Sequence, residues 1–67
     1  MNLDLLKQYI GLRYNDYGLD IEHLCKTHGY SSLPMEVGKD TLIDIDDNRI
    51  IVWIDADDGI IKEYENT

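Results

Sequence analysis

The chain has 67 residues, a formal net charge of −8 and 43% hydrophobic residues, a profile that excludes a disordered chain. Its one cysteine excludes an internal disulfide, and therefore a small secreted scaffold held together by disulfides. It opens with no basic-then-apolar leader and has no apolar run near the roughly 20 residues that a membrane span needs, so we expect one soluble, cytoplasmic domain over residues 1–67.

The N-terminal part of the chain predicts two short helices. Residues 3–10 fit the first, with leucines and an isoleucine at helical spacing. The stretch 13–18 is polar and turn-like. Asp20 can then cap a second helix that runs through His28. The following stretch, 30–38, contains Ser, Pro and Gly and is expected to be the one long connection.

The C-terminal part switches to a strand pattern. Residues 41–45, 49–54 and 60–64 are rich in Ile and Val and predict three strands. The joints 46–48 and 55–59 are rich in Asp, Asn and Gly, which tolerate turn dihedrals. Short joints make neighbouring strands antiparallel. The expected fold class is therefore α+β: two short N-terminal helices followed by a three-stranded antiparallel β-meander.

The alternation along these strands assigns side chains to two faces. The helices should cover one face of the sheet, the core face. We expect this face to hold Ile43, Ile45, Ile50, Val52 and Ile54. On the helices, the residues that pack against it should be Leu6, Ile10, Ile21 and Leu24. The other face is also apolar and holds Leu42, Ile51, Trp53 and Ile61. Either the chain covers this second face itself, by one helix on each side or by the connection 30–38, or the face is an interface centred on Trp53.

The negative charge is concentrated in residues 40–67, where nine carboxylates stand against Arg49 and Lys62, a net charge of −7. The candidate partner-binding acids around the second face and the turns are Asp44, Asp46, Asp47, Asp55, Asp57, Asp58, Glu63 and Glu65. They should form two negative clusters at opposite ends of the sheet. Such clusters could resemble successive phosphates to a nucleic-acid-binding protein, or they could serve solubility alone.

The sequence offers no convincing metal or catalytic motif. Asp44, Asp46 and Asn48 have the spacing of calcium-loop ligands, but Arg49 stands where that loop requires glycine. Cys25 lies near both histidines, yet zinc needs a fourth ligand and the sequence has no further Cys or His. We expect no metal, no cofactor and no enzymatic activity. The scattered cations also argue against direct binding of nucleic acid, and no segment favours membrane binding.

Residues 48–55, followed by 58–61, resemble the closing hairpin of small potato-inhibitor-type serine protease inhibitors. The joint of this hairpin is longer here than in that family. The preceding segment, 38–47, does not match a protease-binding loop. The resemblance therefore assigns no site residues to this chain.

Together these features predict a small acidic binding protein. We expect an inhibitor or adaptor that occupies a basic surface of a partner protein, including a nucleic-acid-binding protein, to which the acidic chain would present a charge pattern like that of nucleic acid. Compact acidic chains of this kind are associated with phages and mobile elements. The alternative is a homodimeric interaction domain joined through the Trp53 face, with acidity serving solubility only.

Overall fold

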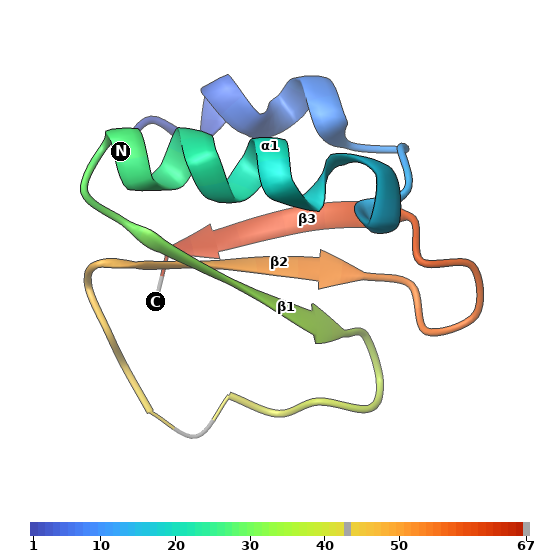
Figure 1. Cartoon of the computed structure of the whole chain (residues 1–67). Helices are drawn as coiled ribbons and strands as arrows, with labels where there is room; N and C mark the ends of the chain where they lie inside the picture. Colours follow the sequence, from blue (N-terminus) through green and yellow to red (C-terminus); the bar gives the residue numbers. More distant parts are fainter. Residues whose placement is uncertain (43, 67) are drawn as a thin grey trace.

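The computed structural model describes residues 1–42 and 44–66, which form two helices and a three-stranded sheet. In chain order the elements are the 3-10 helix η1 (Leu3–Tyr9), the helix α1 (Tyr14–Thr27) and the strands β1 (Ser31–Glu36), β2 (Arg49–Ile54) and β3 (Ile61–Asn66). The spatial order of the strands is β1-β2-β3, and Figure 1 shows both helices together on one side of them. The fold is α+β, as predicted. The sheet is mixed, because β1 and β2 run parallel while β2 and β3 run antiparallel.

Both helices form near their predicted positions, but α1 begins earlier than Asp20. The Asn2 side chain accepts a hydrogen bond from the Asp4 amide at 2.9 Å and so caps η1. The first turn of α1 starts at Tyr14, inside the stretch expected to be a turn. A Cβ atom at Gly18 would lie 3.0 Å from the Tyr14 ring, so glycine allows this ring to lie across the helix. The glycine that suggested a turn is instead a packing residue.

Among the residues expected to form the strand 41–45, the described ones (41, 42, 44 and 45) form none, and the connection before them contains a strand instead. β1 pairs with β2 from Ser31↔Arg49 to Glu36↔Ile54. It is an edge strand, which explains how Pro34, with no amide hydrogen to donate, is accommodated. The antiparallel meander was therefore wrong for its first strand. Ile43 lies outside the described residues.

The core lies between the helices and the sheet. Its fully buried side chains are Leu6, Ile21, Cys25, Ile50, Val52 and Ile61. Leu24 and Ile54 are partly buried against this cluster, as predicted. Ile10 and Ile45 were expected in the core but are 43% and 82% exposed. Ile45 has no strand to turn it inward, because residues 44–48 form no strand.

Ile61 belongs to the core and not to the Trp53 face. The β2–β3 register pairs Trp53 with Glu63 but Ile54 with Ile61, so Lys62 is an extra residue at a bulge. This shift places Ile61 on the same face as Ile54. The chain before α1 fixes it there, because the Ile61 amide donates to the Leu12 carbonyl at 2.8 Å. The predicted position of Ile61 was wrong because the pattern of alternation does not reveal a bulge.

The buried centre of β2 should control stability. We expect Val52→Ala or Ile50→Ala to lower the free energy of unfolding by about 1–4 kcal/mol, through lost burial and a residual cavity. Leu19→Ala is the matched control, because Leu19 is 81% exposed on α1 and its truncation should change stability by less than about 0.5 kcal/mol. Urea unfolding measures both. Equal stability of the Val52 and Leu19 variants would contradict the core assignment.

Candidate protein-binding site

The feature that the topology adds is the connection between β1 and β2, residues 37–48. Because these strands are parallel neighbours, the chain must return from Glu36, at one end of the pair, to Arg49 at the other. At about 3.3 Å per residue the return covers roughly 17 Å. Such returns take about a dozen residues or more and are usually helical. Here the described residues of the return form no helix or strand, and Figure 1 shows an open arc leading away from both helices. We call residues 37–48 the return loop.

The first end of the return loop is fixed by a compact turn after β1. The Val37 amide donates to the Ile54 carbonyl at 2.9 Å, which extends the parallel pairing by one bond. The Asp40 carboxylate accepts from the Glu36 amide at 2.7 Å, and the Asp40 amide donates to the Glu36 carbonyl at 3.0 Å. Gly38 has a φ of +83°, a left-handed conformation that glycine adopts without strain. These reciprocal bonds define the direction in which the loop leaves the sheet.

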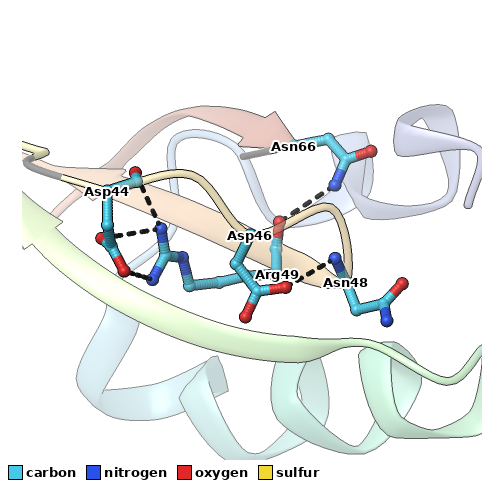
Figure 2. A network of polar contacts seen from close by, with 5 residues as sticks. All are labelled: Asp44, Asp46, Asn48, Arg49 and Asn66. Carbon is cyan, nitrogen blue, oxygen red and sulfur yellow. Dashed lines mark hydrogen bonds and ion pairs between the residues drawn. The ribbon is translucent and has the colours of Figure 1, made fainter.

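The second end of the return loop is held by Arg49, the first residue of β2. Its guanidinium nitrogens Nη1 and Nη2 lie 3.4 and 3.2 Å from Oδ2 and Oδ1 of Asp44, and Nη2 also donates to the Asp44 carbonyl oxygen at 3.3 Å. Figure 2 shows this fork closing across the loop. The Arg49 side chain is only 13% exposed, whereas Asp44 is 65% exposed. The partly buried cation therefore holds an exposed stretch of backbone in place.

The last residues of the loop are ordered by a local turn and by hydrogen bonds from the end of β3. The Asp46 carboxylate accepts from the Asn48 amide at 2.9 Å, which forms a local turn before β2. From the end of β3, the Asn66 side-chain amide donates to the Asp47 carbonyl at 3.1 Å and to the Arg49 carbonyl at 3.0 Å, the second bond being drawn in Figure 2. The loop is thus bound at both ends, while Asp44, Ile45 and the residues up to Asn48 remain exposed.

The predicted acidic clusters lie at the ends of the sheet, and the first surrounds the turn between β2 and β3. The Asp55 carboxylate accepts from the amides of Asp57 and Asp58 at 2.8 and 3.3 Å. These two backbone hydrogen bonds, that of Asp57 first, hold the pKa of Asp55 below its usual value. Asp40 lies at this end too, because β1 and β2 end together.

The second acidic cluster lies around the return loop. Asp46 and Asp47 precede β2, and Glu65 faces Ile51 near the start of that strand. Glu63 lies closer to the other cluster, because it pairs with Trp53 near the end of β2. The loop itself contributes Asp40, Asp44, Asp46 and Asp47 against Lys39, so it is negatively charged along most of its length.

The Trp53 face is not a bare apolar surface. Ile51 is fully buried and Met35 is 9% exposed, so the chain covers the middle of this face itself. Trp53 is half-buried, and its indole nitrogen donates to the Glu65 carboxylate at 3.2 Å. Leu42 is half-buried as well. Trp53 as a partner contact stays a prediction. The structure gives it a hydrogen-bonding partner within the chain.

The described residues show no other chemical site. They contain no group of three or more His, Cys, Asp or Glu side chains that could hold a metal ion, and no pocket opens among them. Cys25 lies on the buried face of α1, and this burial raises the pKa of its thiol. No helix in the described part of the chain has both the length and the apolar character needed to cross a membrane.

Sequence reasoning missed the return loop because Leu42, Ile45 and Asp44 continue an alternation that is typical of a strand. The available signal was the turn-forming composition of residues 44–48, which carry three aspartates and an asparagine. The sequence marked Arg49 only as one of two cations in the acidic segment and as the residue that excludes a calcium loop. Its role at Asp44 depends on the parallel register.

Comparison with known proteins gives one fold relationship. No protein-family model matches the chain, and a search of the curated proteins finds no match. Among solved structures, the bitter gourd trypsin inhibitor is similar, with a TM-score of 0.62 and 21% sequence identity. The match covers 85% of this chain and 79% of the inhibitor. At this identity the likeness shows a shared fold.

The Arg49 fork should govern the order of the return loop. We expect Arg49→Ala to lower the local stability of the loop by about 1 kcal/mol. This corresponds to roughly fivefold faster cleavage within residues 37–48 in limited proteolysis. Lys26→Ala, which removes an ion pair between side chains that are both largely exposed on α1, is the control and should leave the cleavage rate unchanged. Equal rates for the two variants would show that the fork does not hold the loop.

Asp55 should make a pH-dependent contribution to stability. Its pKa is lower in the folded than in the unfolded chain, where it is about 3.9. The contribution is therefore present above pH ~4 and is lost as the pH falls through the folded value. We expect Asp55→Asn to be less stable than the parent at pH 7 and equally stable at pH ~2 in urea unfolding. Asp57→Asn is the control, because Asp57 offers its backbone amide to this turn. A destabilisation by Asp55→Asn that is constant across pH would contradict the electrostatic explanation.

Proposed function

We propose that this chain is a protein inhibitor that occupies a partner's binding cleft with the return loop. The observation that carries the proposal is the loop's geometry: it is bound to the sheet at both ends, while its residues 44–48 are exposed. Binding residues are commonly found on loops that a rigid scaffold positions. A loop that is already ordered loses less conformational entropy when it binds, which raises affinity.

The partner class that we propose is a serine protease, which departs from the expectation, drawn from the sequence, that residues 38–47 hold no protease-binding loop. Support comes from the fold, which is shared with a trypsin inhibitor over most of both chains. Proteases take extended peptide segments into a cleft, and residues 41, 42 and 45 of the return loop lie between the turns at its two ends. An inhibitor of this kind needs no catalytic groups of its own, in keeping with the expectation that the chain is not an enzyme.

The acidity of the loop adds a preference for a basic partner surface. Asp46, Asp47 and Asp44 lie on the exposed part of the loop, so they would come close to the rim of the partner's cleft. Opposite charges at a rim mainly raise the rate of association, and salt weakens the effect. The proposal therefore retains the predicted basic surface on the partner. In it the negative charge speeds association, and the loop makes the contact in the cleft.

The proposal is tested by inhibition assays of the intact chain against a panel of serine proteases at low and high salt. We expect competitive inhibition of at least one protease of the panel. A small inhibitor that already occupies the active site of that protease should prevent the chain from binding. Arg49→Ala should weaken inhibition by about fivefold or more, because the free loop must be ordered on binding. Asp47→Lys should slow association and flatten its salt dependence while leaving dissociation nearly unchanged.

The control variant is Leu19→Ala, which changes an exposed side chain on α1 and should inhibit like the parent. Binding that persists when the protease active site is blocked, or that is unaffected by changes in the loop, would contradict the proposal.

A further inference from the structure

The 3-10 helix η1 covers part of the core, and no hydrogen bond joins it to the other described helix or to the described strands. It is seven residues long, although runs beyond about 3–4 residues are uncommon in this tight helix because its hydrogen-bond geometry is poor. The hydrogen bonds that Leu3–Tyr9 make with described residues all stay within residues 2–12. Of its side chains, Leu6 is fully buried, and Leu3 and Tyr9 are half-buried against the core. Packing, and not hydrogen bonding, therefore holds η1 on the core.

The chain is fixed directly before and directly after η1. At the start, the Met1 amino group donates a hydrogen bond to the Tyr30 hydroxyl at 2.8 Å. Beyond the helix, the Gly11 amide donates to the Ile61 carbonyl at 2.9 Å, and the Ile61 amide donates to the Leu12 carbonyl at 2.8 Å. Figure 1 shows η1 beside α1 on the same side of the sheet. A segment that is fixed at its two ends and held between them only by packing is able to open as one unit.

A buried hydroxyl close to η1 has no hydrogen-bond partner. It belongs to Tyr64 on β3, and it is the only buried side-chain oxygen or nitrogen in this position within the described part of the chain. Tyr64 pairs with Val52 and packs against the core, and β3 contacts η1. Burial raises the pKa of the Tyr64 phenol, and the nearby Cys25 on α1 and Tyr9 on η1 raise it further. A hydroxyl that is shut off from water without a partner destabilises the form that buries it.

We propose that η1 is a strap that opens as a unit while α1 and the sheet stay folded, and that its opening brings the Tyr64 hydroxyl into contact with water. The closed form gains the burial of Leu6, whereas the open form gains the hydration of the hydroxyl. These two effects oppose each other, which lowers the free energy of opening below that of global unfolding. The inference does not rest on the proposed function, because Asp40, Arg49 and Asn66, which hold the return loop, lie outside η1.

Native-state hydrogen exchange of the intact chain, measured for each amide by NMR, tests whether η1 opens separately. After correction for intrinsic rates, we expect the amides of residues 6–9 to exchange at least about 100-fold faster than those of Ile51 and Val52 on β2. Their exchange should depend little on low concentrations of urea, because a local opening exposes little surface. The amides of Ile21 and Cys25 on α1 should exchange as slowly as those of β2. Equal exchange of η1 and β2 would overturn the inference, because η1 would then open only with the whole fold.

Tyr64→Phe then tests whether this opening uncovers the hydroxyl, since it removes the oxygen and keeps the ring. We expect the variant to slow exchange about tenfold in both η1 and β2, because the closed form is stabilised against the open and the unfolded forms alike. Slower exchange in β2 alone would mean that the hydroxyl stays covered when η1 opens. Unchanged exchange in both would mean that the hydroxyl has a partner, and either result would overturn the inference. Tyr17→Phe is the matched control, because Tyr17 is another half-buried tyrosine of the helical layer, and it should leave both rates unchanged.

Discussion

The parallel pairing of β1 with β2 is the constraint on which the rest of the structure depends. A tight turn cannot join parallel neighbours, because the chain leaves one strand at the end opposite to the start of the next. Here residues 37–48 make the return without a helix in their described part. A buried segment of this kind would leave backbone polar groups without partners, so the loop lies at the surface. Exposure of the candidate site therefore follows from the topology of the sheet.

An exposed return loop is held in place by several contacts, each of which contributes little to stability. An ion pair between exposed groups contributes only about 0–1 kcal/mol. The Arg49 fork improves on this because the guanidinium is mostly covered and reaches both the carboxylate and the backbone of Asp44. Asp40 at one end, and Asp46 and Asn66 at the other, add hydrogen bonds close to the sheet. This arrangement constrains the ends of the loop while residues 44–48 remain exposed.

The sequence predicted the elements whose local pattern and packing agree. β2 is found as expected over 49–54, because a run of Ile, Val and Trp favours a strand in any context. β1 was missed because Ser31, Ser32 and Pro34 argue against a strand, and only its position at the edge makes them tolerable. The acidic character of the site was readable from composition. Its location was not, because the exposure of Ile45 depends on a parallel pairing that local alternation cannot reveal.

The division between core and loop has a consequence for how this domain can change. The side chains that stabilise the fold lie on the helices, β2 and the start of β3, and those that would meet a partner lie on the return loop. Ile45 is largely exposed, so a change there removes little burial and should alter stability by a few tenths of a kcal/mol. Arg49 is the exception, because it belongs to β2 and also holds Asp44. The exposed residues of the loop can therefore change with little cost to the core, provided that Arg49 and Asp44 are kept.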